Sequence, residues 1–583
     1  MTPAGLQSLR SLKCRRGIVL ALNLATYGAL VGVLAHVLGA GGWTAVDVCL
    51  LVPFLIGAPW TVLGFWNAVL GLWLLHGCRN GLSRVAPYAS AGDSNGPLCL
   101  RTAVAMTLRN EDPWRAVARL AVVKASLDRT GFGDRFAYFI LSDTSDPAVV
   151  AQEEDAVRAQ QKAEDAWIVY RRRAVNVGFK AGNLRDFCER WGGDFDLMLP
   201  LDADSLMSGE TVVRLVRMMQ AYPKLGILQS LVVGMPSDSA FARMFQFGMR
   251  HGMRSYTMGA AWWSADCGPF WGHNALVRIA PFYECCELPV LPGGAPLGGH
   301  ILSHDQVEAA LMRRAGYEVR VLPVECGSWE ENPPSILHFT QRDLRWCQGN
   351  MQYWRLLAMR GLKLTSRFQL ACAILMFLSV PAWTLMLALM PFKAIDGKDP
   401  ALFPAGLAIG LYLVFQAMYL MPKIAGLLGT LFTPGGLARY GGALRFSASA
   451  AVELTFSYLL GAVTTLRTSV FMIGLLFGRS VKWSGQVRDV AMLSWRATMR
   501  RLWWHGLFGI AVATALALTR PVVLLWALPL IAGYLIAIPF AMLTAAPCVG
   551  ALYVRTGLNG IPEDFDPPDE IKRLRSLSAA ADE

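Results

Sequence analysis

Three groups of polar residues in the middle of this 583-residue chain have the types and the spacing of a reaction site. In chain order they are Asp202 and Asp204, then Asp305, then Gln341, Arg342, Arg345 and Trp346. The first pair offers hard oxygen ligands for Mg²⁺ or Mn²⁺, which can hold both phosphates of a diphosphate. The last group joins cations to an indole ring beside apolar, membrane-like sequence. Together the three groups predict transfer of a sugar from a nucleotide-diphosphate donor next to a membrane.

Asp202 and Asp204 alternate at the end of the apolar run Leu197–Leu201. Acidic pairs with this spacing are common on protein surfaces and in helix caps, so the pair alone would not define a site. Its position directly after a buried strand favours a metal site. Lys180 can neutralise the remaining phosphate charge, and Gly182 is expected to let the backbone approach the phosphates.

Asp305 follows Ser303 and His304 and precedes an amphipathic helical pattern. Ser303 or Asp305 could simply be the N-cap of that helix. Sugar transfer with inversion, however, needs a carboxylate that takes the proton from the attacking hydroxyl. The two roles are compatible, because a helix start also holds a carboxylate rigidly. We predict that Asp305 is the base.

The segment Gln341–Trp346 would by default be a membrane-surface helix with a basic face. Its indole ring favours a site instead. Arg342 or Arg345 could stabilise a departing diphosphate, while Trp346 offers an apolar face to an acceptor sugar. Trp271, His273 and Asn274 are interpreted as lining the same acceptor cleft, with a structural role as the equal alternative.

Four apolar runs predict the strands that must position these side chains, at 102–108, 136–141, 167–170 and 197–201. Each run ends in polar residues, and helical patterns separate them. In an open α/β sheet, ligands bind beyond the carboxyl ends of the strands. The substrate contacts predicted there are Asn110, Glu111, Asp143, Lys180, Asn183 and Asp202.

The composition indicates an integral membrane protein, because 54% of the residues are hydrophobic and only 16% are charged. The predicted membrane helices are 17–40, 48–75, 370–391, 402–421, 510–518 with its flanks, and 522–544. Arg15 and Arg16 precede the first of these helices, and Arg79 and Arg84 follow the second. By the positive-inside rule, the N-terminus and the middle domain are expected in the cytoplasm.

The run Ser449–Gly478 is too short for two full spans, yet basic residues flank it on both sides. A kinked hairpin or a partly interfacial, pore-lining pair is therefore expected. Glu453 and Arg467 lie inside this run, where they could be functional, could reach the interface, or could form a mutual structural pair.

The net charge of +12 is spread over membrane flanks and forms no basic stripe, so no nucleic-acid partner is expected. The twelve cysteines include no CxxC pair, which agrees with a reducing compartment. The predicted organisation is an α/β domain of the GT-A (Rossmann-like) type between α-helical transmembrane segments. Its parts are a membrane region with two helices (1–98), the cytosolic catalytic domain (99–350), an interfacial helix (351–368), a membrane region with four or more transmembrane or re-entrant helices (369–550) and a cytosolic tail (551–583).

In these motifs the chain resembles the processive, inverting family 2 glycosyltransferases, which include cellulose synthase and carry a D, DxD, (T/S)xD and Q(Q/R)xRW series. Asp143, Asp202-Ala203-Asp204, Ser303-His304-Asp305 and the segment Gln341–Trp346 match in order. Further segments are similar to the glucosyltransferases of osmoregulated periplasmic glucan synthesis. They include Ile140–Asp143, Tyr170–Arg173, Trp271–Asn274 and Ile301–Asp305, and the resemblance continues to Ile561-Pro562-Glu563.

The resemblance implies UDP-glucose as donor, a β-1,2-linked glucan as product, Mg²⁺ or Mn²⁺ as cofactor and export of the chain through the bacterial inner membrane. It implies that Asp143 and Lys180 contact the nucleotide, Asp204 the metal and Asp305 the acceptor. Gln341, Arg342, Arg345 and Trp346 would face the diphosphate and the acceptor. Implied partners are the glucan acceptor chain, the lipid bilayer, an acyl carrier protein and a periplasmic glucan-processing protein. Ser303-His304-Asp305 departs from the Thr-Glu-Asp of the cellulose synthase type.

Two alternatives remain open at this point. Another family 2 polymer synthase would make cellulose, β-1,3-glucan or an amino-sugar polymer, because the residues do not reveal which hydroxyl attacks. A protein of a different class, an export scaffold, would bind the nucleotide sugar without turnover.

Overall fold

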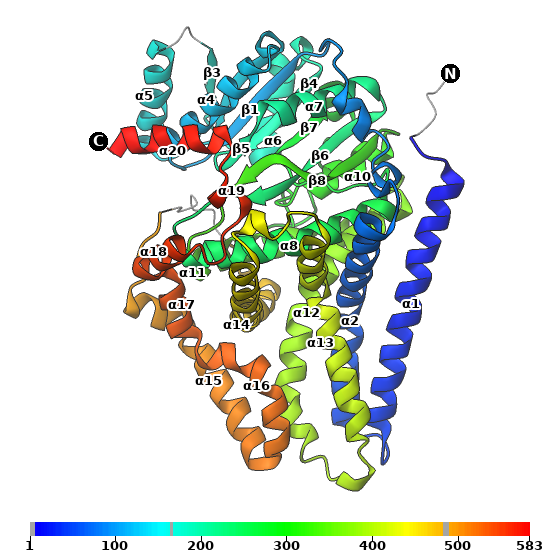
Figure 1. The fold of residues 1–583 in the computed structure, drawn as a ribbon. Helices are drawn as coiled ribbons and strands as arrows, with labels where there is room; N and C mark the ends of the chain where they lie inside the picture. The colour runs from blue at the N-terminus through cyan, green and yellow to red at the C-terminus, as the bar shows by residue number, and fades with distance from the viewer. Residues whose placement is uncertain (1–5, 164–166, 482–488, 583) are drawn as a thin grey trace.

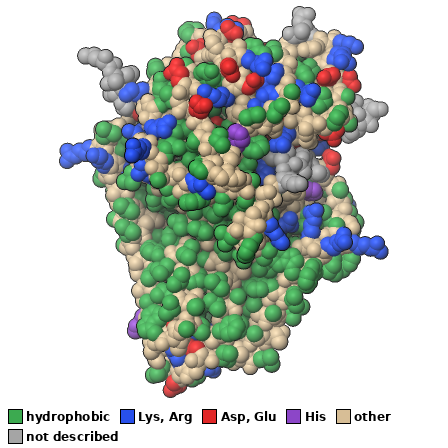
Figure 2. Space-filling view, turned by 180° about the vertical axis from the view of Figure 1, so that it is seen from behind, with side chains coloured by type: hydrophobic (Ala, Val, Ile, Leu, Met, Phe, Trp, Pro, Cys, Tyr) green, Lys and Arg blue, Asp and Glu red, His purple; other side chains and the backbone are tan. Residues whose placement is uncertain are grey.

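The computed structural model describes residues 6–163, 167–481 and 489–582 of the chain. An α/β domain stands on a set of long helices, and both ends of the described chain lie on the side of that domain (Figure 1). Hydrophobic side chains cover the long helices in a broad band, whereas Lys, Arg, Asp and Glu gather over the α/β domain (Figure 2). Such a division is typical of a membrane protein with one water-exposed domain.

One eight-stranded mixed sheet forms the centre of the α/β domain, in the order β3-β2-β1-β4-β7-β6-β8-β5. The strands are β1 (Thr102–Leu108), β2 (Phe136–Ser142), β3 (Ile168–Arg172), β4 (Leu197–Asp202), β5 (Ser205–Met207), β6 (Leu225–Gly234), β7 (Ala275–Arg278) and β8 (Glu318–Glu330). Strands β3, β2, β1 and β4 are parallel, and β7 runs antiparallel to both β4 and β6. The predicted strands are confirmed, because continuous apolar runs such as β1 are buried on both faces of a parallel sheet.

Helices cover both faces of the sheet and bury two separate cores. The helices of this domain are α3 (Gly81–Val85), α4 (Pro113–Arg129), α5 (Pro147–Ala163), α6 (Phe179–Trp191), α7 (Gly209–Ala221), α8 (Ala240–Ser264), α9 (Ile279–Cys285), α10 (Asp305–Arg314) and α11 (Ile336–Met351). Helices α4, α5 and α7 pack on one face, and α6, α9 and α10 on the other. Local signals start several of them: Asp112 caps α4 ahead of Pro113, and Ser208 caps α7.

Helix α8 lies between the sheet and the membrane helices (Figure 1). It packs against α2 so closely that a Cβ on Gly259 would be 2.0 Å from the carbonyl oxygen of Asn67. The domain therefore rests directly on the membrane helices.

The apolar helices are α1 (Leu9–Gly39), α2 (Ala45–Leu72), α12 (Leu364–Lys393), α13 (Ala405–Phe432), α14 (Ala443–Leu476), α15 (Trp495–Thr519), α16 (Pro521–Leu535) and α17 (Ala537–Ala545). Within the described residues, six helices are long and apolar enough to cross a membrane, or seven if the pair α16 and α17, bent by 57°, counts as one span. Arg16 near the start of α1 pairs with Asp266 of the α/β domain at 2.5 Å. The start of α1 and the domain therefore share one side of the membrane region, as the basic residues predicted.

The expected kinked hairpin at 449–478 is wrong, because α14 is one helix of 34 residues without proline. Its start packs on α8 through Phe446 and Phe247, and Val481 beyond its end donates a backbone hydrogen bond to Gln348 of α11 at 2.8 Å. Both flanks thus lie against the α/β domain, in agreement with their basic residues. The predicted helix at 351–368 is also absent as such: α11 ends at Met351, a short 3-10 turn follows and α12 begins at Leu364.

Of the roles left open for Glu453 and Arg467, a mutual pair is excluded by the distance between them in α14. Along a straight helix the two residues are about 21 Å apart, too far for an ion pair. Glu453 instead accepts hydrogen bonds from Lys423 of α13 and from Ser457, the latter at 2.6 Å. This buried charge is paired between two membrane helices.

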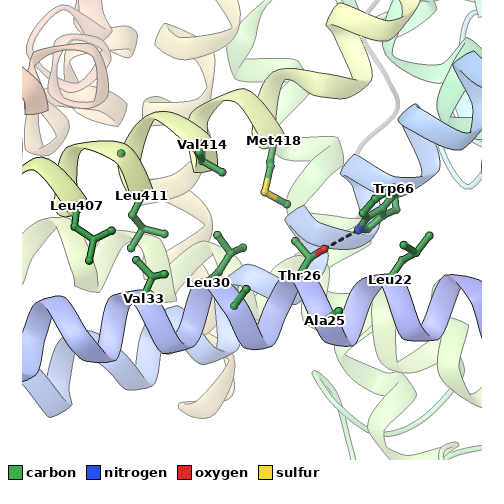
Figure 3. A pocket seen from close by; sticks show the side chains of 12 residues that line it. Leu22, Ala25, Thr26, Leu30, Val33, Trp66, Leu407, Leu411, Val414 and Met418 are labelled. Carbon is green, nitrogen blue, oxygen red and sulfur yellow. Dashed lines mark hydrogen bonds between the residues drawn. The ribbon is translucent and has the colours of Figure 1, made fainter.

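A cavity of about 640 Å³ lies between α1, α2 and α13 (Figure 3). Leu30, Val33, Leu411 and Met418 point into it, and its one polar pair is closed by the hydrogen bond from Trp66 to Thr26 at 3.0 Å. This apolar space belongs to the membrane helices and lies outside the sheet domain.

Candidate active site

The polar residues predicted to form a site meet at one edge of the sheet. In the strand register Leu108 is opposite Ser142, and Thr107 is opposite Asp202. The loops that begin at Asn110 and Asp143 therefore start beside Asp202. Because the three strands are parallel, their carboxyl ends form a shared ligand edge.

Asp202 and Lys180 form an ion pair across this edge, with Asp202 partly exposed. Thr107 donates to the same carboxylate at 3.3 Å. Burial alone would raise the pKa of Asp202, but Lys180, with smaller effects from His273 and His304, lowers this pKa to about 2. The carboxylate is therefore ionised at neutral pH and can exchange its lysine partner for another cation.

The turn after Asp202 is held by a buried arginine. Arg119 donates to the carbonyl oxygen of Ala203 at 2.9 Å and pairs with Glu331 at 2.6 Å. The backbone N–H of Glu331 in turn donates to the carbonyl oxygen of Asp204 at 3.3 Å. These contacts fix the backbone that carries the predicted metal ligand.

The carboxylates of Asp202 and Asp204 fit a cation that is shared with a substrate. Among the described residues, no group of three or more His, Cys, Asp or Glu could hold a metal ion by itself. Mg²⁺ in proteins is commonly bound by one or two carboxylates together with substrate phosphates. The donor set is therefore suited to an ion that arrives with a diphosphate.

Asp143 is held by Arg173, which donates to both carboxylate oxygens at 2.7 Å. Arg173 also donates to the carbonyl oxygen of Phe179 at 3.0 Å. The arginine thus ties the end of β2 to the start of α6, the helix that carries Lys180. Asp143 fixes this loop in addition to any contact with a nucleotide.

Asn110 and Asn183 brace the same edge from within. Asn110 accepts hydrogen bonds from the backbone of Ser145 and Asp146 at 3.0 and 3.1 Å. Asn183 is only 1% exposed, donates to the carbonyl oxygen of Leu141 and accepts from a buried arginine. In this structure its side chain supports strand β2 and does not face the open edge.

Gly182 has a structural role in the turn before α6 that the sequence did not predict. A Cβ at this position would lie 2.0 Å from the carbonyl oxygen of Val177, so the close backbone approach is to the chain itself. Gly182 permits the tight turn into α6, and this turn places Lys180.

Asp305 is the first residue of α10, and His304 occupies the N-cap position without a side-chain cap. The alternative role of Ser303 or Asp305 as the N-cap residue is therefore not supported. A Cβ on Gly272 would lie 3.5 Å from the Cβ of Asp305, so the loop before β7 packs on the helix start. Burial is the largest effect on Asp305 and raises the pKa of this carboxyl, partly offset by His304 and Lys180.

His304 stands between the two acidic groups of the site. Its Nδ1 lies 2.8 Å from Oε2 of the buried Glu308, one helical turn along α10. Burial would lower the pKa of His304, but Glu308 reverses the shift and raises it. The imidazolium form is thereby favoured beside Asp202 and Asp305.

Helix α11 presents the basic and aromatic segment to the same edge. Burial lowers the pKa of Arg345 to about 10, while Glu111 and then Asp202 act in the opposite direction through their charges. The guanidinium therefore lies within electrostatic reach of two of the predicted donor-site carboxylates. Gln341 is on the same helix and is partly buried.

Trp346 follows Arg345 in α11 and is 45% exposed. The guanidinium of Arg342 lies 4.8 Å from its ring centroid, a cation–π contact that orients the indole. Asp343 follows Arg342 in the sequence. When ionised, its carboxylate can only accept hydrogen bonds, and it accepts one from Thr468 of α14 at 3.4 Å. Burial raises the pKa of Asp343 to about 6. Helix α11 thus places Arg345 within electrostatic reach of the sheet edge and touches a membrane helix through Asp343.

The segment Trp271–Asn274 is partly structural. Asn274 is fully buried and donates to Ser328 Oγ at 2.9 Å and to the carbonyl oxygen of Trp329 at 3.2 Å. His273 lies 3.6 Å from Glu330 and contributes to the charge around Asp202. Trp271 is anchored by its backbone N–H on Gln229 at 2.9 Å and leaves its ring partly exposed.

Sequence reasoning did not single out Arg119, Arg173 and Glu308. Glu308 carries a local signal, because it follows His304 at the i,i+4 spacing of one helix face. Arg119 and Arg173 act on turns far away in the sequence, and no local spacing marks them.

The comparison with family profiles agrees with this geometry. The profile described as glycosyl transferase family 2 matches residues 104–285, and glycosyl transferase family group 2 matches residues 197–415. The fold and the site define a family 2 glycosyltransferase domain of the GT-A type, flanked by apolar helices.

Similar proteins define the family of the chain more narrowly than the profiles do. Glucans biosynthesis glucosyltransferase H of Vibrio cholerae is 35% identical over 96% of this chain and 79% of its own length. The protein of the same name from Xanthomonas campestris pv. campestris is 35% identical over 97% of this chain and 90% of its own. The chain belongs to the glucans biosynthesis glucosyltransferase H family, which confirms the resemblance seen in its motifs.

A solved structure is also similar to the chain. It is a mannosyltransferase from Pyrobaculum calidifontis in complex with GDP-Man and Mn²⁺, with a TM-score of 0.39 and 16% identity, and the match covers 65% of this chain and 99% of that one.

Proposed function

We propose that this protein transfers glucose from UDP-glucose to the end of a growing glucan, with inversion at the anomeric carbon. The product is proposed to be a β-1,2-linked backbone that leaves through the protein's own membrane helices. The family supports the glucan, and the motif series supports a processive, inverting reaction. The observation that carries the proposal is the ion pair of Lys180 with Asp202 at the strand edge, with Asp305 at the start of α10 within reach of the Lys180 charge.

Asp305 is proposed as the base. As the acceptor hydroxyl oxygen bonds to the anomeric carbon, its proton passes to Asp305, and the bond to the diphosphate breaks with both electrons leaving on UDP. Burial suits this role, because it raises the pKa and makes the carboxylate a better proton acceptor.

Lys180 and Arg345 are proposed to face the diphosphate. Lys180 already neutralises a carboxylate at the edge, and the Arg345 guanidinium is held in a buried setting where its charge acts strongly. The oxygens of Asp202 and Asp204 would hold Mg²⁺ or Mn²⁺, which would offset the charge of the phosphates when bound. Asn110, Glu111 and Asp143 then shape the nucleotide end of the site.

The acceptor is proposed to lie between Trp346, Arg342 and the loop of Trp271 and His273. The exposed indole of Trp346 offers a flat apolar surface to a pyranose ring, and Arg342 fixes its orientation. Because α11 also contacts α14, this acceptor position leads toward the membrane helices.

The setting is proposed to be the bacterial inner membrane, with the catalytic domain and the N-terminus in the cytoplasm. The flanking arginines support this orientation. A periplasmic glucan-processing protein and an acyl carrier protein are proposed as partners from the family resemblance alone.

Linkage analysis of the product tests the proposal. Purified full-length protein in lipid nanodiscs is given labelled UDP-glucose, and the polymer is analysed after methylation. Pure 1,2 linkages are expected. Pure 1,4 or 1,3 linkages would point to another kind of polymer synthase, and donor binding without UDP release would point to an export scaffold.

A further inference from the structure

The chain returns to the catalytic domain after its last membrane helix. This C-terminal segment comprises α18 (Pro547–Thr556), α19 (Pro562–Phe565) and α20 (Asp569–Asp582). Helix α20 packs on α4, where Ile571 is 3% exposed and Glu570 accepts from Ser126 at 2.5 Å and from Arg129 at 3.0 Å. Figure 1 shows α19 next to β8 and α20 beneath α4 and α5. The segment is thus part of the folded domain.

Glu563 is a buried carboxylate of this segment with three hydrogen bonds. Its two carboxylate oxygens accept from Arg250 of α8 at 2.5 and 3.1 Å, and one of them also accepts from Nε1 of Trp329 at 3.1 Å. The side chain of Glu563 is 9% exposed and that of Arg250 is 2% exposed. Both carboxylate oxygens of Glu563 therefore accept hydrogen bonds, from the charged guanidinium of Arg250 and from the indole N–H of Trp329.

Arg250 is shared with the sheet. It also donates to Glu325 of β8, at 3.1 Å from Nε and 2.5 Å from Nη2. The buried guanidinium of Arg250 therefore joins three elements: its own helix α8, the C-terminal segment and strand β8. Truncating one partner of such a network is costly, because a buried charge is then left without its counterion.

Trp329 lies where β8 pairs with a neighbouring strand on each side. It is opposite Leu206 of β5 and opposite Val233 of β6 in the strand register. Strand β5 begins directly after Asp204. The β8 backbone around Trp329 therefore sets the position of the turn that carries this carboxylate.

The residues on either side of Trp329 support the rest of the site. Ser328 receives the side-chain hydrogen bond of Asn274, and the carbonyl oxygen of Trp329 receives a second one. Glu330 lies 3.6 Å from His273. One short stretch of β8 thus braces both the turn after Asp202 and the loop that packs on Asp305.

We infer that Glu563 is a positioning residue for the catalytic site, acting through Trp329 and Arg250 on this stretch of β8. The inference rests on the proposed function, because it assigns Glu563 to the holding of the metal and donor groups named there. The role of Glu563 is proposed to be indirect, through its contacts with Arg250 and Trp329. Glu563 holds strand β8, whose neighbour β5 begins directly after Asp204, and it couples β8 to helix α8, which packs on the membrane helices.

A matched contact in the same helix separates positioning from simple attachment. Asp564, next to Glu563, pairs with Arg243 of α8 at 3.0 Å, and that arginine is also 2% exposed. Arg243 donates further to the carbonyl oxygens of Ser237 and Leu558, neither of which belongs to β8. Asp564→Asn therefore loosens the same segment on the same helix without removing a contact to Trp329.

The test uses full-length protein in lipid nanodiscs with Mn²⁺ and UDP as probes. Mn²⁺ binding in the presence of UDP is measured by electron paramagnetic resonance, UDP release gives kcat and KM, and thermal melting reports attachment. Glu563→Gln and Trp329→Phe are each expected to weaken Mn²⁺ binding about fivefold or more and to lower kcat. Asp564→Asn is expected to stay within about twofold of wild type in Mn²⁺ affinity while lowering the melting temperature to a similar extent.

Equal Mn²⁺ affinities for Glu563→Gln and Asp564→Asn would overturn the inference while leaving the proposed function intact. If Glu563→Gln does not fold, Trp329→Phe alone decides, since it keeps an aromatic core residue and removes the indole donor. Unchanged Mn²⁺ affinity in that variant overturns the inference. The proposed function itself would be overturned if the wild-type protein neither bound Mn²⁺ with UDP nor released UDP. The wild-type protein is therefore measured before any variant.

Discussion

Lys180 and Asp202 form an ion pair across the open edge of the sheet, from the first turn of α6 to the last residue of β4. The pair keeps a cation at the point where a donor diphosphate is proposed to bind. A bound metal ion could replace the lysine at Asp202, which would release the ammonium group to the phosphates. The ion pair therefore keeps the carboxylate proposed to hold the metal next to the lysine proposed to face the phosphates, before the diphosphate binds.

Lys180→Gln is expected to raise the KM for UDP-glucose by about tenfold, because a charge-assisted contact to phosphate is lost. The effect should appear in binding of UDP measured by calorimetry as well as in KM. Lys162→Gln, on the exposed surface of α5, serves as the control and should change neither value. An unchanged UDP affinity in Lys180→Gln would remove this residue from the donor site.

Asp305→Asn should lower turnover by about a hundredfold or more, since general-base catalysis commonly contributes this much. UDP-glucose binding should be nearly unchanged, because the amide keeps the shape of the side chain. The measurement is UDP release with a parallel binding titration. Asp134→Asn, at a solvent-exposed position, is the control for charge loss. Preserved turnover in Asp305→Asn would sink the assignment of the base.

The pH dependence of kcat should report the buried setting of Asp305. A base works only when deprotonated, so turnover falls as the pH drops through its pKa. Burial raises this pKa, so the acid limb should lie above the ordinary aspartate value of roughly 3.9. A pH–rate profile of UDP release at saturating donor measures the limb. A kcat that stays flat down to about pH 4 would contradict a raised pKa at the base.

Removal of divalent ions should abolish UDP release, and added Mg²⁺ or Mn²⁺ should restore it. Asp204→Asn is expected to need a higher metal concentration for half-maximal turnover, because one carboxylate oxygen ligand loses its charge. Glu210→Gln, an exposed acidic position at the start of α7, is the control. Turnover that persists in a strong chelator would exclude the metal role of Asp202 and Asp204.

The sheet and the gathering of the site were predictable because the signals are local. Continuous apolar runs such as Thr102–Leu108 define buried parallel strands, and the polar residue after each run must lie at the shared edge. The motifs of Asp202 and Asp305 could therefore be placed before the geometry was known. The family of the chain could be predicted from the same short segments.

Other features depend on contacts between distant segments and carry no local signal. The side chain of Asn183 accepts a hydrogen bond from a buried arginine of β3, and a Cβ on Gly182 would clash with the carbonyl oxygen of Val177. The course of α14 follows from packing on α8 and α11, which its composition does not encode. Sequence patterns set the period and the polarity of an element, whereas its partners are set by the whole fold.

The pair of Glu453 and Lys423 gives a prediction about stability within the membrane region. Glu453 is 3% exposed and Lys423 26% exposed, and Ser457 completes the contact. Glu453→Ala would leave the ammonium group of Lys423 in an apolar setting without its counterion, which typically costs about 3–5 kcal/mol. We expect a clear drop of the melting temperature in nanodiscs. Ser457→Ala, which removes one neutral donor, should lower it much less.

The double variant Glu453→Gln/Lys423→Met distinguishes a structural pair from a functional one. Replacing both charges removes the desolvation cost together with the attraction, so the melting temperature should recover toward that of wild type. Recovery of stability with normal UDP release would assign the pair to helix packing. Recovery of stability with polymer synthesis lost would instead place the two charges on the path of the glucan through α13 and α14. A double variant no more stable than Glu453→Ala would contradict the paired-charge explanation, because the unpartnered ammonium would then not be the cause of the loss.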